Sequence, residues 1–533
     1  MFTHERRKRH RHEPVNGAAA VFPSERSPFL LLEQGVYAAL FLSVALACSF
    51  ALSVQYTLPK LACVYALMPL IAALWLERLR RGHLQPLPVW VCGTGLAFAV
   101  WLVVSTLFAW HVPTAVFGLY SRSNGLGLHL VCLALCLFCA SSRMSPEAIE
   151  RRVGLFAVAL VPMAAYAVYQ YYHPDPSFLD QRRAHSTVGH PVVVAAILAL
   201  AVPFVVTWCT LTARPLRRCA WGAVLALFLA AIATSLSRGP LAGLAAAGAV
   251  VVLGRVRESV ARFGTAAVLG VGAGAVGLAV LVITVATMVR PGSVGSFTSR
   301  FMWMGAALAM IRDYPITGVG LENYALAYPR YRPVDNPIDV IPTQVHNGYL
   351  HFAATAGIPA LVLYAAFVLT VGLTLYAAYG RGTSRRARAV TVAFAAAIVG
   401  YLVQDLSGWL EVSLSVFFWI LVGLAVAWSA QGGPSDTRLP RWGMVLGYAC
   451  GVSAICGSRL LFAHAVSEIR ADVRLARAEG GDSVQHWPLR EGDIAAALEQ
   501  MPADADRSAP AAGSRGGCRR GVGSASPRRR PLI

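Results

Sequence analysis

Charged residues are scarce in this sequence of 533 residues: Asp, Glu, Lys and Arg make up only 14% of it, whereas apolar residues make up 56%. A typical soluble domain has about a quarter charged residues and about half apolar ones. A soluble chain could not bury so much apolar surface. The composition therefore excludes an ordinary water-soluble domain and indicates a membrane protein.

Lysine is almost absent as well. Lys8 and Lys60 are the only lysines among the 46 basic residues, so 46 − 2 = 44 are arginines, and the 26 acidic residues leave a formal charge of +20. Such basicity alone is compatible with nucleic-acid binding. The arginines, however, form short clusters between long apolar runs. We therefore predict membrane lipids of an anionic leaflet as partners, and no nucleic acid.

Metal-binding patterns are also missing. The sequence has no pair of Cys-x-x-Cys motifs, and most of its 11 cysteines lie in apolar runs, where cysteine commonly acts as a small apolar side chain. No loop predicted to face outward gathers acidic residues and histidines at metal-site spacing. We predict neither a metal nor a cofactor.

Long apolar runs recur from end to end. Each has the length and composition of a membrane-spanning helix, and the period-two pattern of a β-barrel is missing. The fold class predicted is all-α, a polytopic transmembrane helical bundle of about 12 to 13 spans with one large periplasmic loop containing short helices. The runs are Val36–Tyr56, Leu61–Leu76, Val89–Trp110, Leu126–Ala140, Val153–Tyr171, Pro191–Cys209, Trp221–Ser235, Leu241–Leu253, Thr265–Met288, Gly357–Tyr379, Val390–Val403, Leu414–Ala430 and Gly443–Ala463.

Arginine clusters predict the orientation of the bundle, because basic residues collect on the cytoplasmic side. The clusters occupy the N-terminal tail and then every second loop, for example Arg78 to Arg81, Arg214 to Arg218 and Arg381 to Arg388. The first run follows a long basic tail and is interpreted as a retained signal-anchor. We expect a multi-pass protein of the bacterial inner membrane whose active site faces the periplasm.

Six regions follow from this pattern. The large loop is the expected functional face, and its segment Phe297 to Ile311 suits a helix at the membrane surface. The regions are 1–35, a basic cytoplasmic tail; 36–288, the first nine spans; 289–356, the large periplasmic loop with interfacial helices; 357–463, the C-terminal spans; 464–507, a short helical region; and 508–533, a disordered arginine-rich tail.

Arginines on the outward side are informative because the sorting rule does not place them there. Arg238 lies in a tight hairpin between two spans, Arg300 in the large loop, and His346 where that loop re-enters the membrane. A guanidinium suits phosphate oxygens, and a histidine at this boundary suits a general base. Alternatively, Arg238 and Arg300 reach lipid headgroups or pair with Glu322, Asp405 or Glu411.

These residues carry a resemblance. The chain, from its first span to about Ala430, resembles the bacterial O-antigen ligase and O-antigen polymerase superfamily of integral-membrane glycosyltransferases. The sequence departs from the family pattern at Ala354-Thr355-Ala356 and at Gly189-His190-Pro191-Val192. The resemblance rests on Ser237-Arg238-Gly239, Ser299-Arg300-Phe301-Met302-Trp303 with Asp313 to Gly320, Glu322-Asn323-Tyr324 to Pro329, and His346-Asn347-Gly348-Tyr349-Leu350 with Gly357-Ile358-Pro359.

The resemblance implies transfer of a glycan from an undecaprenyl-pyrophosphate carrier to an acceptor hydroxyl on lipid A-core or on another glycan, without a nucleotide sugar or a metal. Arg238 and Arg300 would hold the charge of the leaving pyrophosphate, and His346 would act as the base toward the acceptor. Further candidates for substrate binding are Arg122, Arg182, Arg183, Glu322, Tyr324 and Asn347.

A ligase is the preferred interpretation, with an O-antigen or exopolysaccharide polymerase as the alternative. A transporter of polysaccharide or lipid-linked sugar is a reading from another class, although charged residues at mid-membrane and internal repeats, which are typical of transporters, are not evident. A structural scaffold, with the arginines as lipid anchors, is a third.

Overall fold

The computed structural model describes residues 28–120, 122–174, 183–255, 293–332, 341–431 and 441–478. Within these ranges every extended element is a helix, and the only β-type pairing is an isolated bridge between Leu84 and Ser142. Ten helices among the described residues are long and apolar enough to cross a membrane. The predicted fold class, an all-α polytopic bundle, is confirmed.

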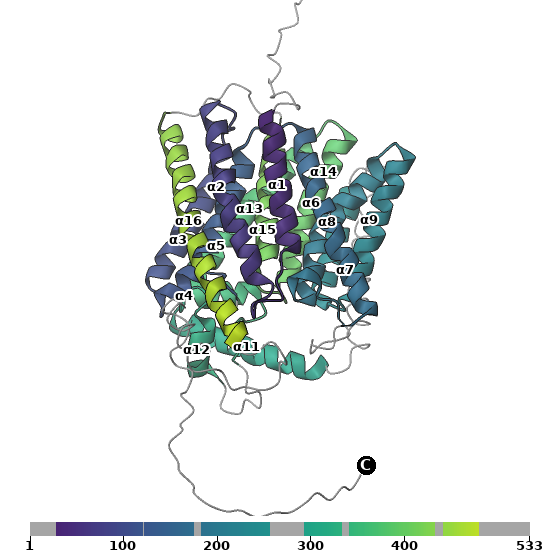
Figure 1. Cartoon of the computed structure of the whole chain (residues 1–533). Coiled ribbons are helices and arrows are strands. Elements are labelled where there is room, and N and C mark those ends of the chain that lie inside the picture. Colours follow the sequence, from purple (N-terminus) through teal and green to yellow (C-terminus); the bar gives the residue numbers. More distant parts are fainter. Residues whose placement is uncertain are drawn as a thin grey trace, which may run out of the picture.

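Most helices run side by side (Figure 1). Helices α6 and α7, separated by a break at Leu160, count as one spanning candidate. Helix α5 is apolar but shorter than the spanning candidates. The parallel helices are α1 (Pro28–Leu46), α2 (Thr57–Arg80), α3 (Val89–Leu107), α5 (Leu126–Ser141), α6 (Pro146–Ala159), α7 (Val161–Tyr172), α8 (Pro191–Leu211), α9 (Pro215–Thr234), α13 (Gly348–Arg381), α14 (Arg385–Asp405), α15 (Val412–Ser429) and α16 (Arg441–Ala478), together with a helix over residues 238–255.

Helix α15 forms the centre of the bundle, and all of its residues are buried. It packs closely on α5, where Gly423 lies against the Cys136 carbonyl so tightly that a Cβ would clash. Trp419 extends from α15 into an aromatic cluster with Phe98 of α3 and Tyr364 of α13. The apolar sequence of α15 therefore reflects a helix surrounded by protein, not by lipid.

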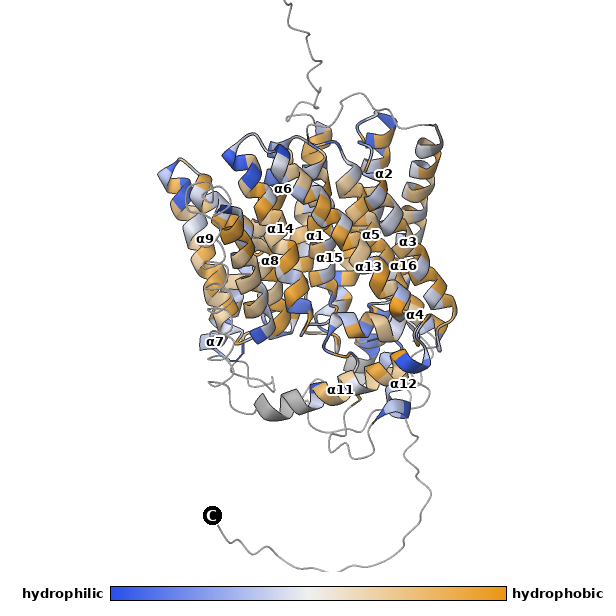
Figure 2. Cartoon of the chain, turned by 180° about the vertical axis from the view of Figure 1, so that it is seen from behind, coloured by the Kyte–Doolittle hydropathy of each residue, from blue (hydrophilic) through white to orange (hydrophobic). Residues whose placement is uncertain are grey.

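The two ends of the bundle differ. The C-terminal end of α2 and the N-terminal ends of α9 and α14, all bearing arginine clusters, lie at one end, which we call the arginine end (Figure 1). Helices α11 (Ser293–Asp313) and α12 (Tyr324–Tyr331) lie at the opposite end, the loop end, together with the short α4 (Val112–Phe117) and η1 (Ser186–Val188). Apolar residues cover the flanks between the two ends (Figure 2).

Helix α11 lies across the loop end rather than along the bundle (Figures 1 and 2). It contains the segment predicted to lie at the membrane surface. Met310 of α11 packs with Tyr324 and Tyr328 of α12 in a small apolar core that is separate from the main one. The part of the large loop that the structure describes is thus a folded cap on the bundle.

Several predicted bounds differ from the helices. Helix α1 begins at Pro28 rather than Val36, because the Glu33 carboxylate pairs with arginines and so does not interrupt the helix. Helix α16 continues to Ala478, so the predicted boundary between 463 and 464 lies inside one helix. The predicted span Thr265–Met288 and the tail 508–533 lie outside the described residues.

Helix α13 is broken at Gly357, whose backbone is left-handed in φ (85°) and extended in ψ (165°). The loop segment from Pro315 to Gly320 packs against this break. Val319 N–H donates to the Ala354 carbonyl oxygen, and Gly320 N–H donates to the Thr355 carbonyl oxygen. A Cβ at Gly357 would clash with the Ile316 carbonyl. Gly357 is therefore required by both its backbone angles and its close neighbour.

Candidate functional site

Two of the motifs meet at the C-terminal end of α14. Gly348, the first residue of α13, lies against the Asp405 carboxylate, and Gly239 lies against the Ser407 hydroxyl. Any side chain at either glycine would clash with these groups. The glycines beside Arg238 and His346 therefore bring the two segments to the same point of the loop end.

The helix that starts at Arg238 also packs on α14 without side chains between them. Gly243 and Gly400 face each other, and a Cβ on Gly400 would lie 2.9 Å from the Gly243 carbonyl oxygen. Such small-residue contacts allow membrane helices to approach closely. The position of Arg238 is thus fixed by the backbone of α14.

His346 is held between two tryptophans. Its ring stacks on Trp303 of α11 at a centroid distance of 4.9 Å and meets Trp409 edge-on at 4.8 Å. Nδ1 of His346 is buried and has no hydrogen-bond partner among the described residues. The imidazole is therefore fixed in place and has a nitrogen available for a ligand.

Positive charge surrounds this imidazole. Burial, followed by the charges of Arg300 and Arg122 and by His351, lowers the pKa of His346 to about 3. The pKa of His190 is also lowered to about 3, by burial and then by Arg183, Arg122, His346 and Arg300. These groups act on one another, so Arg122, Arg183 and Arg300 share one site with His346.

Arg183 supports the turn before Arg238. Its Nε donates to the Ser235 carbonyl oxygen and its Nη2 to the Ser237 hydroxyl, both at 2.9 Å. Leu236, between the two serines, has a positive φ of 48°. Arg183 thus holds the strained turn that presents Arg238, while Arg182, also predicted to bind substrate, lies outside the described residues.

Glu322 lies beside a histidine that the sequence did not single out. Its Oε1 is 3.8 Å from His351 Nε2, both side chains are buried, and Glu322 Oε2 has no partner within the described part of the chain. The charge of Glu322 also acts on Arg122. This carboxylate therefore lies within the cationic site and not at the surface.

Two predicted substrate-binding residues have structural contacts. The hydroxyl of Tyr324, a fully buried residue, donates to the Trp303 carbonyl oxygen at 2.7 Å. The Asn347 side chain caps α13 by accepting from Leu350 N–H at 3.0 Å. Tyr324 thus positions the segment that carries Trp303, and Asn347 begins the helix that follows His346.

Backbone strain gathers at this end of the molecule. Five described residues other than glycine have a positive φ: Ser123, Ser186, Leu236, Glu322 and His346. Each is a site residue or lies within a few residues of one in the sequence, and such conformations persist where surrounding structure enforces them, often at functional sites. The strain supports a functional role for this end of the bundle.

Some site residues escaped the sequence interpretation. The sequence marks His190 only as a departure from the family pattern and gives no sign of Trp409, yet their rings meet at a centroid distance of 4.3 Å. Gln344 has a buried oxygen without a partner in the described ranges, as does Asp405, which the sequence suggested only as a partner for the arginines. Only His351 could have been found from the sequence, because it lies one helical turn beyond Asn347 in α13 and so near the same boundary.

Acidic, histidine and cysteine side chains do not come together in threes anywhere in the described ranges, as a metal site would require. The site is built from guanidinium, imidazole and indole groups. Groups of these kinds can bind anions and transfer protons, and the prediction that the site works without a metal stays a prediction.

Residues 223–365 match the family model described as O-antigen ligase. The chain carries an O-antigen ligase family domain. The matched segment includes Arg238, Arg300, Glu322, Tyr324 and His346, while Arg122 and Arg183 precede it. The resemblance to the O-antigen ligase and polymerase superfamily is thereby confirmed.

No curated protein matches the chain. The family match and the many apolar helices indicate a multi-pass membrane protein. The match supports the function of an O-antigen ligase or of its polymerase relatives, and it indicates a glycosyltransferase-like enzyme. 

Proposed function

We propose that the protein is an O-antigen ligase that moves a glycan from undecaprenyl pyrophosphate to a hydroxyl of lipid A-core, on the periplasmic face of the inner membrane. The observation that carries this proposal is a single site, inside or beside the family domain, in which the charges of Arg122 and Arg300 act on His346 and the charge of Arg183 acts on the neighbouring His190. An anionic donor at a membrane boundary is the ligand that such a site fits.

The arginines act on the leaving group. Pyrophosphate leaves with negative charge, so the barrier falls when preorganised cations lie where that charge develops. Arg300 and Arg122 supply this charge beside His346, and Arg238 is presented from the turn held by Arg183. In this proposal the bond from the anomeric carbon to the carrier phosphate breaks as the acceptor oxygen attacks from the opposite face.

His346 acts on the acceptor. With a pKa lowered to about 3, the free imidazole is neutral and able to accept a proton. Bound pyrophosphate offsets the charges of Arg300 and Arg122, which raises the proton affinity of His346 when the donor is in place. The base thus strengthens in the complex that needs it, and its unpartnered Nδ1 is the atom that we assign to the acceptor hydroxyl.

The test is glycan profiling of a deletion strain, by lipopolysaccharide gel and by analysis of carrier lipids, complemented with wild type, His346→Ala or His173→Ala. His173 is an exposed histidine after α7 and serves as the matched control. A ligase predicts loss of the surface ladder with long glycan stranded on the carrier, restored by wild type and His173→Ala only.

Other profiles would contradict the ligase. Surface chains that stop at one repeat unit would assign the protein to the polymerases. An unchanged profile would exclude this glycan as the substrate. Full complementation by His346→Ala, at normal protein abundance, would remove the imidazole from the mechanism.

A further inference from the structure

A second cluster of charged side chains lies at the arginine end, opposite the candidate site. Glu33 of α1 accepts from Arg78 of α2, with Nε–Oε1 at 3.0 Å and Nη2–Oε2 at 2.5 Å. Arg152 of α6 places Nη2 at 3.2 Å from the same carboxylate. All three side chains are at most 5% exposed, so the cluster is buried.

The cluster has more positive charge than negative. Two guanidinium groups share one carboxylate, and the Arg78 Nη1 donates to the Arg143 carbonyl oxygen. Nη1 of Arg152 is buried and has no hydrogen-bond partner in the part of the chain that the structure describes. The Arg152 guanidinium lies 4.0 Å from the centroid of the Tyr37 ring, which offsets part of its charge. Two guanidinium groups against one carboxylate still leave a net positive charge, which favours an anion.

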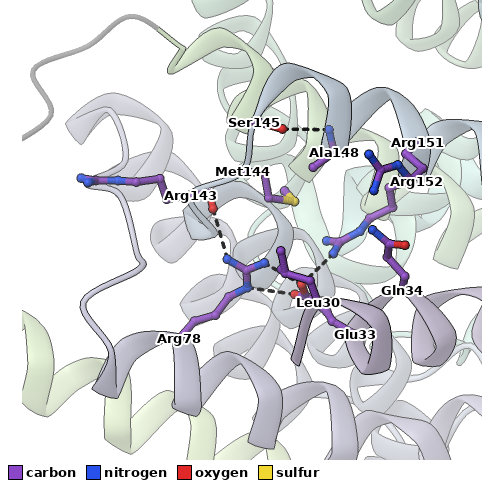
Figure 3. A pocket seen from close by; sticks show the side chains of 10 residues that line it. All are labelled: Leu30, Glu33, Gln34, Arg78, Arg143, Met144, Ser145, Ala148, Arg151 and Arg152. Carbon is purple, nitrogen blue, oxygen red and sulfur yellow. Dashed lines mark hydrogen bonds and ion pairs between the residues drawn. The ribbon is translucent and has the colours of Figure 1, made fainter. Parts of the chain in front are cut away.

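This cluster forms one wall of a pocket. Four arginines and one glutamate are among the lining residues, which also include Gln34 and the start of α6. Figure 3 shows Arg151, Arg152 and Gln34 on the same side of the pocket, whereas the Arg143 side chain extends away. The N-terminal end of α6, capped by Ser145, adds the positive end of a helix dipole.

The surroundings favour a lipid as the source of that anion. Leu31 and Leu32 follow Leu30, a pocket residue, and are 57% and 53% exposed on a membrane-spanning helix. Such side chains contact acyl chains, whereas the arginines lie at the level of headgroups. A lipid headgroup and a soluble anion can both present a phosphate to the arginines. Only a lipid would also place acyl chains against the exposed leucines.

We propose that this pocket binds the phosphate of an anionic lipid in the leaflet at the arginine end, through Arg152 Nη1 with Arg151 and Gln34. Arg78 and Glu33 hold Arg152 in place and do not contact the lipid. The site is separate from the proposed glycosyl transfer, so its test requires no glycan substrate.

The experiment is native mass spectrometry of the purified, delipidated full chain with added phosphatidylglycerol, compared with phosphatidylcholine of the same acyl chains. We expect preferential retention of phosphatidylglycerol by wild type. Arg152→Gln and Arg151→Gln should bind it about tenfold more weakly, because a hydrogen bond to a charged group is lost. Arg80→Gln is the matched control, since Arg80 lies exposed at the same end and pairs with Glu77.

Three results would overturn the proposal. Equal affinity for the two lipids would exclude an anion-selective site, and equal retention in Arg80→Gln and Arg151→Gln would place the lipid elsewhere. If inorganic phosphate protects wild type against thermal unfolding as well as phosphatidylglycerol does, the pocket binds a soluble anion instead. Arg151 is half-buried, whereas Arg152 is buried, so Arg151→Gln decides the question if Arg152→Gln fails to fold.

Discussion

His346 is exposed to two influences that oppose its protonation, namely burial between Trp303 and Trp409 and the charge of Arg300 and Arg122. Binding of an anionic donor reverses the second influence and leaves the first. The proton affinity of His346 is therefore coupled to occupancy of the site. This coupling gives the residue a pH signature.

The acid limb of activity should lie at higher pH in kcat than in kcat/KM. A histidine with a pKa of about 3 is neutral at every higher pH, so the free enzyme should lose no base between about pH 5 and 8. In the donor complex the pKa rises, and the base is lost as pH falls through that raised value. Profiles of both constants for the purified protein measure the difference. Coincident acid limbs near the ordinary value of 6.5 would contradict the coupling.

Arg300→Ala should lower kcat/KM by about 10²- to 10³-fold, as expected for removal of a preorganised charge. It should also raise the pKa of His346 in the free protein, because Arg300 is the largest charge contribution to its lowering. Arg312→Ala, on the same helix but exposed, is the control. An NMR titration of His346 that does not change in Arg300→Ala would show that the two groups are not coupled.

Sequence could predict which residues belong to this site better than what each does. The hairpin and the re-entry point predict Arg238, Arg300 and His346 at one boundary. The structure brings the segments of Arg238 and His346 together at the end of α14, and Trp303, three residues after Arg300, stacks on His346. Asn and Tyr serve equally well as ligands, caps or core, so the contacts of Asn347 and Tyr324 were not predictable. Trp409 and His190 lie far apart in the chain and meet only through the fold.

At the scale of elements, two helices near the site are in direct backbone contact, with no side chains between them. The helix over 238–255 approaches α14 through Gly243 and Gly400. Long apolar runs predicted both helices, but such runs carry no information about which helices touch. Bounds were least predictable where a charge is neutralised in the fold, as for Glu33 in α1.

Gly243→Ala should reduce glycan transfer or protein abundance, because its methyl group would clash with the Gly400 carbonyl. Overpacking of this kind costs about 1–3 kcal/mol. Gly248→Ala, in the same helix, has nothing within 4 Å of its Cβ and should resemble wild type. Immunoblotting and glycan profiling measure the two effects, and equal behaviour of both variants would exclude tight packing at Gly243.

At the scale of the whole molecule, the arginine end and the loop end are separate, and the candidate site lies at the loop end. Composition and charge alternation predicted a polytopic helical bundle because membrane insertion obeys simple rules of hydropathy and charge. They could not predict that α15 is enclosed by protein, since a buried helix and a lipid-facing one have equally apolar sequences.

The orientation predicts opposite locations for two fusion points. Alkaline phosphatase, which is active only outside the cytoplasm, should be inactive when fused after Arg214 at the arginine end and active when fused after Arg332 in the large loop. A fusion of a cytoplasmic fluorescent protein should show the reverse pattern. Active phosphatase after Arg214 would invert the predicted topology and place the candidate site in the cytoplasm.

The break of α13 at Gly357 has a mechanical meaning. Ala354 and Thr355, before the break, and Ile358, directly after it, are hydrogen-bonded to the loop from Pro315 to Gly320, and the rest of α13 continues beyond this point to Arg381. Spans adapt to bilayers of different thickness by tilting. With a joint at this position, the outer part of α13 can tilt while the segment beside His346 stays fixed, so we expect the alignment of donor and acceptor to be insensitive to the acyl-chain length of the surrounding lipids.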